Sequence, residues 1–411
     1  MLALNPSRFD ITAKTIFGRA VLDNNESQFP RMVYEEHLRV WNGFFENSPR
    51  KETKEDFLES FEQILKAHRD NKFVNAFSKI PMSPTGNIAN GSHRIASAIL
   101  QNRKVVFEKA TFNQPEPFNF AFFRDRGLSD NILDSMTLEY IRLSTKNLHM
   151  LLLYPHADQD NQAVIDIIES AGTVVREKTI TVPNSGAINF IHQTYFGEKW
   201  ASTTDQFSLI RKTVNTFGSG KGPHKVRAVL VEVEKPRTGL LREKQEIRKR
   251  FQSHHFVHTT DTKRECDIVS RMVFNANSLS FVSKRNLSQL TPRFDELFKD
   301  FDAVAPHEDR CIDSGGVLAA YGIRDVGGDL DYLYRADGLH PRESPGGISN
   351  HLSQSPFFTD SIDEILTNPG KHFFYLGHKF ATLEVVRNMK KTRNESKDTR
   401  DILLIDKFLS K

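Results

Sequence analysis

The sequence predicts a multidomain protein of the α+β class, and three observations support this. The chain has 411 residues, more than one ordinary hydrophobic core accommodates, so two or three domains are expected. The middle of the chain alternates apolar, strand-like runs with helical patterns. Near the C-terminal end an acidic strand follows a glycine turn. We place the domains at residues 1–145, 146–285 and 286–411.

The composition of the chain makes several classes of protein less favoured. The formal net charge of +4 is small, and charges of both signs are interspersed, which gives little support to nucleic-acid binding. The two cysteines, Cys266 and Cys311, are too few for a disulfide framework. The opening residues MLALNPSRFD lack the pattern of a signal peptide, and no run approaches the roughly 18 apolar residues of a membrane helix. We therefore expect a cytoplasmic protein without a membrane span.

The first domain is predicted to be mainly helical. Residues 31–70 follow helical spacing on both sides of a polar connection, and Thr53 is placed to cap the second of these helices. The segment NGSHRIASAI then predicts a turn and a helix from about 92 to 101, with a strand at 104–108. The first turn of a helix presents free N–H groups that bind anions, so this turn is a candidate phosphate site.

This segment resembles the short box of the ParB/sulfiredoxin-like superfamily. Asn90, Gly91, His93, Arg94 and Ala96 match that box in place. The resemblance implies a phosphate or nucleotide site formed by Asn90, Gly91, His93 and Arg94. In such a site Arg94 would clamp a phosphate and His93 would donate or shuttle a proton. A purely structural turn is the alternative. The helix-turn-helix domain of the DNA-binding members is not found here.

The middle domain is predicted to contain strands at 149–155 and 226–234, and a helix at about 186–196. The segment FVHTTDTKREC then predicts a strand and turn followed by a helix, with His258 at the end of the strand. A histidine in this place either performs chemistry or is a buried residue satisfied by Asp261.

The run from His258 to Thr262 resembles the catalytic segment of nucleoside diphosphate kinases, with Thr where that family has Ser. Tyr195 matches the tyrosine on which the nucleotide stacks, and Arg248 matches a phosphate-binding arginine. The resemblance implies a ferredoxin-like fold and a phosphorylated histidine intermediate at His258. Thr260 and Asp261 would orient the ring.

The match to the kinases has gaps. The phosphate-binding lysine of that family falls near residues 154–156, where this chain has no lysine, and the acid that positions the histidine falls near Val269. A shared fold without kinase activity is therefore an open alternative.

The C-terminal domain carries the pattern on which the functional prediction depends. Ser314, Gly315 and Gly316 form a small-residue turn, and Asp329 and Asp331 follow in an apolar run. Alternate residues of a strand share a face, so the two carboxylates are predicted to point the same way. They are predicted to bind Mg²⁺, and the turn is predicted to meet the phosphates of a nucleotide.

Residues 310–406 resemble the nucleotidyltransferase superfamily, which has a glycine turn, a short helix and two acids one residue apart. At the C-terminal end Lys397, Asp398 and Asp401 match a Lys-Asp pair and a further acid of its minimal bacterial branch. The segment from ISNH to FATLEVV also resembles uncharacterised proteins of that branch associated with surface-polysaccharide loci. The third carboxylate of active members is not found on the predicted strand HFFYLGHKF. An inactive relative is therefore the alternative, and His351 is either a phosphate contact or a surface residue.

Together these patterns predict Mg²⁺-dependent transfer of a phosphoryl or nucleotidyl group from an NTP, ATP or CTP, to a small molecule. A sugar or surface-glycan precursor is the expected acceptor. One alternative is a nucleotide-sensing or DNA-associated protein that has lost catalysis. Another is a nucleotidyltransferase that modifies a macromolecule. A homo-oligomer remains open.

Overall fold

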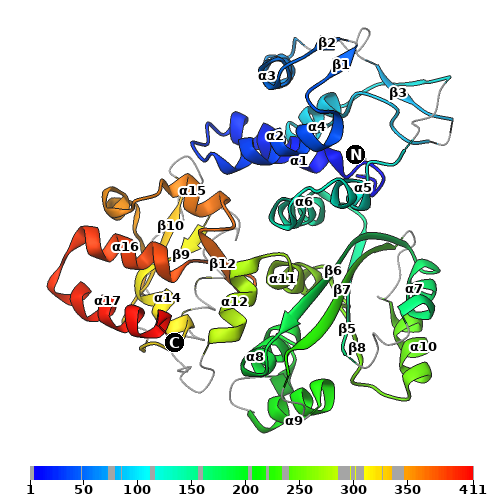
Figure 1. The fold of residues 1–411 in the computed structure, drawn as a ribbon. Coiled ribbons are helices and arrows are strands. Elements are labelled where there is room, and N and C mark those ends of the chain that lie inside the picture. Colours follow the sequence, from blue (N-terminus) through cyan, green and yellow to red (C-terminus); the bar gives the residue numbers. More distant parts are fainter. Residues whose placement is uncertain are drawn as a thin grey trace. The chain divides into compact units, whose positions relative to one another are not determined.

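The structure is a computed structural model, and helices and strands are mixed throughout it, which confirms the predicted α+β class (Figure 1). It divides into two compact units, of which the first comprises residues 1–148, 172–176 and 231–236 and the second comprises the rest. The structure describes residues 4–47, 49–72, 79–84, 86–111, 116–155, 161–201, 206–218, 222–233, 240–285, 297, 301, 310–325, 327–335 and 347–410.

Helices make up most of the first unit. Helix α1 packs against α2, α3, α4 and α6. Where α1 meets α2, the rings of Phe17 and Tyr34 stack with their centroids 4.8 Å apart. Thr53 caps α3 as predicted, because its side chain accepts a hydrogen bond from Asp56 N and the Asp56 side chain accepts one from Thr53 N. The helices are α1 (Asp10–Leu22), α2 (Phe29–Asn42), α3 (Lys54–Arg69), α4 (Ser92–Leu100), α5 (Phe120–Asp125) and α6 (Asp130–Leu143).

Two small sheets complete this part of the chain. Strands β1 (Glu46–Asn47) and β2 (Arg50–Lys51) form an antiparallel hairpin. Strands β3 (Ile80–Met82) and β4 (Phe107–Lys109) pair in parallel, and α4 connects them. The predicted helix at 92–101 is thus confirmed, and the strand predicted at 104–108 lies slightly further along the chain.

A buried ion network fixes the start of α1. The carboxylate of Asp10 accepts hydrogen bonds from Arg8 Nε at 2.9 Å and Lys14 Nζ at 2.8 Å, and all three side chains are buried. Burial alone would raise the pKa of Asp10, but the two cations outweigh it and hold that pKa well below its usual value. Each of the two cations therefore stabilises the buried charge of Asp10.

The middle of the chain forms a four-stranded sheet in the order β6-β7-β5-β8. The short strand β8 runs antiparallel to β5, with His258 opposite Leu152. Helices α7 and α10 lie on one face of the sheet and α8 and α11 on the other (Figure 1). The elements are β5 (Asn147–Leu153), α7 (Asn161–Glu169), β6 (Thr173–Val182), α8 (Asn184–Thr194), α9 (Gln206–Phe217), β7 (His224–Val233), α10 (Leu241–Phe251), β8 (Val257–Thr259), α11 (Lys263–Val273) and α12 (Ala276–Lys284).

The C-terminal part forms a five-stranded sheet in the order β11-β10-β9-β13-β12. Strand β10 is antiparallel to β9 and parallel to β11, and β13 is parallel to β9. The elements are β9 (Arg310–Ile312), α14 (Ser314–Ala320), β10 (Leu330–Tyr334), β11 (Ile348–Asn350), the 3₁₀ helix η6 (Leu352–Phe357), α15 (Ile362–Thr367), β12 (His372–Tyr375), β13 (His378–Ala381), α16 (Leu383–Arg393) and α17 (Ser396–Leu409).

No helix in the described part of the chain is both long and apolar enough to cross a membrane.

A close backbone approach at Gly172 generates a stability prediction. A Cβ atom at this position would lie 2.2 Å from the carbonyl oxygen of Glu232, and backbone cannot move aside as a flexible side chain can. We expect Gly172→Ala to lower the free energy of unfolding by about 1–3 kcal/mol or more, measured by urea denaturation. Gly222→Ala is the control, because a Cβ there meets nothing within 4 Å. Equal stabilities of the two variants would contradict the packing described here.

Candidate functional site

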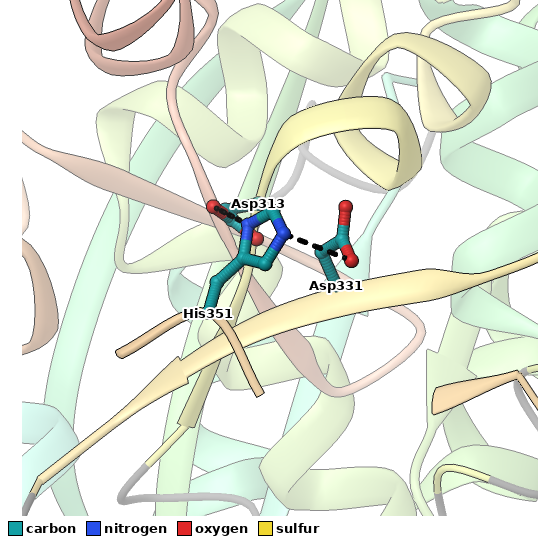
Figure 2. Close-up of side chains that lie close together, drawn as sticks. All are labelled: Asp313, Asp331 and His351. Carbon is teal, nitrogen blue, oxygen red and sulfur yellow. Dashed lines mark hydrogen bonds and ion pairs between the residues drawn. The ribbon is translucent and has the colours of Figure 1, made fainter. Parts of the chain in front are cut away.

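Two carboxylates and an imidazole meet in the C-terminal sheet (Figure 2). His351 lies between the acids, with Nδ1 at 3.2 Å from Asp313 Oδ2 and Nε2 at 3.1 Å from Asp331 Oδ1. Each of the three residues offers one ligand atom, and these atoms lie within 4.8 Å of one another. Asp313 is buried, and the other two side chains are partly exposed. We call these three residues the Asp-His-Asp cluster.

Strand pairing produces this arrangement. Asp313 follows β9 directly and Asp331 lies in β10, and the backbone N–H of Asp313 donates to the carbonyl of Asp331 at 3.0 Å. His351 follows β11, and its backbone N–H donates to the carbonyl of Tyr332 at 2.9 Å. The three side chains therefore come from three neighbouring strands, and the hydrogen bonds of the sheet fix their spacing.

The pKa values of the cluster reflect shared charge. Burial, together with the negative charges of Asp313 and Asp329, raises the pKa of Asp331 to about 6, although the charges of His351 and Lys390 act in the opposite direction. Burial lowers the pKa of His351, but its hydrogen bond to Asp313 and the two carboxylate charges outweigh this and raise it. The two carboxylates thus bring negative charge together at this point, and a bound cation would neutralise it.

One atom of the cluster is unpaired. Asp313 Oδ2 contacts His351 and also accepts from the Ser314 hydroxyl at 3.2 Å. Asp313 Oδ1 is buried, and it has no hydrogen-bond partner among the described residues. A buried carboxylate oxygen without a donor is costly unless a cation or water satisfies it.

The sequence predicted Asp331 as a metal ligand together with Asp329. The structure places Asp329 before β10, exposed to solvent and outside the cluster, although its charge acts on Asp331. Sequence reasoning weighed His351 only as a phosphate contact or surface residue and missed Asp313. The available signal was the position of Asp313, between an apolar strand and the glycine turn.

The glycine turn lies against cationic side chains. Ser314 has a positive φ of 50°, and an Arg324 guanidinium nitrogen lies 2.9 Å from where a Cβ of Gly315 would be. A Cβ at Gly316 would lie 2.7 Å from Ile312, so that residue packs onto the sheet instead. Arg324 in turn pairs with Asp401 at 3.3 Å. The turn predicted to meet phosphates therefore has a guanidinium beside it.

The C-terminal helices hold two further cations. Lys390 is buried and contacts Asp398 at 3.2 Å and Asp401 at 2.9 Å, and Arg393 contacts Asp398 at 2.7 Å. Lys397, which matched the lysine of the Lys-Asp pair in the sequence and was predicted on that basis to bind phosphate, is exposed and pairs with Glu395. Lys390 is the lysine that the structure brings to the two aspartates.

A second cluster surrounds the histidine of the middle domain. His258 lies buried in β8, with its ring edge-on to that of Tyr195 at 4.6 Å between centroids. Burial, together with the charges of Lys244, Lys212 and Arg248, lowers the pKa of His258 to about 3. Among the described residues, neither Nε2 of His258 nor Nε of Arg248 has a hydrogen-bond partner.

These cations repel one another. Burial, together with the charges of Arg248 and Lys244, lowers the pKa of Lys212 to about 8. The ammonium group of Lys212 lies 5.0 Å from the Tyr195 ring centroid and 3.2 Å from His255 Nδ1. We call Lys212, Lys244, Arg248 and His258 the basic cluster. Lys212 brings to His258 a positive charge that was not predicted from the sequence.

The other residues predicted for this site have structural contacts. Thr260 accepts a hydrogen bond from Met150 N at 2.9 Å through its hydroxyl, and its carbonyl lies 2.8 Å from His149 Nδ1. The backbone N–H of Asp261 donates to Glu265 at 2.7 Å, at the start of α11. These contacts hold the segment that follows His258.

In the segment 90–99 of the N-terminal domain, the side chains of His93 and Arg94 have different partners. His93 Nε2 lies 2.7 Å from the Tyr34 hydroxyl, and burial lowers the pKa of His93 well below its usual value. Arg94 donates to the carbonyl of Lys79 at 2.9 Å and folds back over Gly91, whose φ is +92°. Asn90 accepts a hydrogen bond from Gly91 N through its side chain at 2.5 Å.

Comparisons with family models, with curated proteins and with solved structures found no match to this chain.

The Asp-His-Asp cluster generates a titration prediction. We expect Asp313→Asn to lower the pKa of His351, because Asp313 provides both its hydrogen bond and the largest charge that raises this pKa. The measurement is a pH titration of the histidine ring signals by NMR without added metal. Asp325→Asn, an exposed change between α14 and β10, is the control and should leave the signal of His351 unchanged. An unaltered titration of His351 in Asp313→Asn would contradict the geometry.

Proposed function

We propose that the chain is an enzyme that transfers a nucleotidyl or phosphoryl group from an NTP, ATP or CTP, to a small molecule in a reaction that needs a divalent cation. The observation that carries this proposal is the Asp-His-Asp cluster beside the glycine turn. Its architecture, with Asp331 in β10, Asp313 directly after the neighbouring strand β9 and the short helix α14 beginning at Ser314, supports a nucleotidyltransferase-like domain.

The residues present fit a cation. Asp313, Asp331 and His351 would hold it, and the unpaired Oδ1 of Asp313 would gain a partner. When bound, the cation supplies neutralising charge at the transferring phosphoryl group. Asp329 is exposed beside the cluster and adds negative charge on the solvent side.

The cationic side chains suit the phosphates of the nucleotide. Arg324 lies beside Gly315 and can form paired hydrogen bonds to a phosphate. Lys390 and Arg393 act on the cluster through their charges, as the pKa effects on Asp331 and His351 indicate. The acceptor in this proposal is a sugar or surface-glycan precursor, and this part rests on the sequence resemblance alone.

Substitution of Asp331 tests the transfer reaction. The full chain is incubated with labelled ATP and CTP, Mg²⁺ or Mn²⁺ and a panel of sugars and sugar phosphates, and products are separated by chromatography. We expect Asp331→Asn to reduce nucleotide turnover by at least about 100-fold, because charge stabilisation at the phosphoryl group is a large term in such reactions. Asp325→Asn is the matched control and should keep full turnover.

The other possible results either contradict the proposal or favour one of its alternatives. Turnover that survives Asp331→Asn, or that needs no divalent ion, contradicts it. Nucleotide binding without turnover by the unaltered chain favours the nucleotide-sensing alternative. Transfer of label to proteins or nucleic acids in a lysate, detected by mass spectrometry, favours the macromolecule-modifying alternative.

A second candidate function is phosphate binding in the middle domain, and the basic cluster is the observation that favours it. Three cations from α9 and α10 lower the pKa of a buried histidine, and two of the nitrogens in the cluster are unpaired in the described part of the chain. The order β6-β7-β5-β8, with α7 and α10 as the connections, is that of a split βαβ sheet and supports a ferredoxin-like domain. A phosphate group there would relieve the repulsion among the cations.

Lysine substitutions test this second function. We expect Lys212→Ala to weaken binding of inorganic pyrophosphate by roughly 10–150-fold, since one charge-assisted contact contributes roughly 1.5–3 kcal/mol. Binding is measured by calorimetry in an Asp313→Asn, Asp331→Asn background that removes the other site. Lys225→Ala changes an exposed lysine on β7 and is the control. Identical affinities of the two lysine variants would count against a phosphate site.

A further inference from the structure

We infer that the Asp-His-Asp cluster selects a first-row transition-metal cation such as Mn²⁺ over the Mg²⁺ that the sequence predicted. This inference rests on the cation site of the proposed function but not on the transfer reaction itself. Three observations carry it: the donor set, the way in which His351 is held, and the shortage of further carboxylates on the sheet.

The donor set combines one nitrogen with carboxylate oxygens. Mg²⁺ prefers oxygen ligands in octahedral geometry and keeps several of its waters, whereas an imidazole nitrogen favours transition metals. Affinity for sites with nitrogen donors rises from Mn²⁺ across the first row. Replacing an oxygen donor by the imidazole of His351 therefore shifts preference away from Mg²⁺.

His351 is held as metal-bound histidines usually are. One ring nitrogen, Nδ1, lies 3.2 Å from the buried carboxylate of Asp313, and the other, Nε2, faces Asp331 at 3.1 Å. A carboxylate that accepts the proton of one ring nitrogen fixes the tautomer and leaves the second nitrogen as the ligand. Asp331 lies on the side of the ring that this second nitrogen faces.

The sheet offers no carboxylate that could replace the imidazole. Among the described strands β9 to β13, Asp331 is the single acidic residue. The remaining acid of the cluster, Asp313, lies at the end of β9, and Asp329 is exposed before β10. The third protein donor that the structure brings to this point is therefore the nitrogen of His351.

The test measures metal binding by the full chain without nucleotide. Mn²⁺ binding is followed by electron paramagnetic resonance, and Mg²⁺ is added as the competitor. We expect the site to prefer Mn²⁺ by at least roughly 10-fold, as a nitrogen donor predicts. Pulsed spectra of bound Mn²⁺ should show coupling to a histidine nitrogen, a readout that needs no variant. Equal affinity for the two ions, or bound Mn²⁺ without nitrogen coupling, overturns the inference.

Variants identify the nitrogen. His351→Asp should abolish the nitrogen coupling and the preference for Mn²⁺ while an all-oxygen site for Mg²⁺ remains. His254→Asp alters an exposed histidine of the same unit and should change neither. Asp313→Asn should weaken Mn²⁺ binding by about 10–100-fold through loss of the carboxylate that supports His351. A preference for Mn²⁺ that persists in His351→Asp overturns the assignment of His351 as the ligand.

The outcomes also separate this inference from the transfer reaction. Mn²⁺ bound through nitrogen by a chain that turns over no nucleotide supports the inference and rejects the proposed function. Turnover supported by Mg²⁺, with no nitrogen coupling at the bound cation, supports the function and rejects the inference.

Discussion

The hydrogen bonds between β9, β10 and β11 are the constraint on which the proposed chemistry depends. They bring the end of β9 beside the start of β10 and place the residue after β11 over Tyr332. Three side chains that are up to 38 residues apart in the chain thereby come within contact distance. A shift of register by one residue would turn Asp331 to the other face of the sheet and disperse the cluster. The fold thus determines the site through backbone pairing more than through the side chains themselves.

The candidate sites differ from the structural charge networks of the same chain, because each candidate site gathers side chains whose charges have the same sign. Asp10 is buried between two cations, and that network needs no further partner. The Asp-His-Asp cluster contains a buried carboxylate oxygen that has no hydrogen-bond partner among the residues that the structure describes, and the basic cluster gathers three cations around a histidine whose pKa is lowered. Unbalanced charge is unfavourable in a core, so these are the places where a ligand of opposite charge would stabilise the protein most.

Much of the local structure could be predicted from the sequence. The capping box at Thr53, the helix after the turn at Gly91 and the strand that carries Asp331 follow from short-range patterns, and the structure contains them. Residues that come together only through strand pairing could not be found in this way. Asp313 contacts His351, which lies 38 residues further along the chain, and the contact of Lys390 with Asp401 depends on how α16 packs against α17. Lys397 was predicted from a sequence match. The rotation of α17 about its axis decides which of its side chains face the site, and the match does not reveal that rotation.

The central claim is that a cation binds between Asp313, Asp331 and His351 and holds the phosphates of a nucleotide near Gly315. Anomalous X-ray diffraction from crystals grown with Mn²⁺ and a non-hydrolysable NTP analogue tests it most directly. The account predicts an anomalous peak bonded to these three side chains, with the triphosphate beside the glycine turn and Arg324. A peak at another place, or a nucleotide bound away from this turn while the cluster keeps its metal-free contacts, would contradict it.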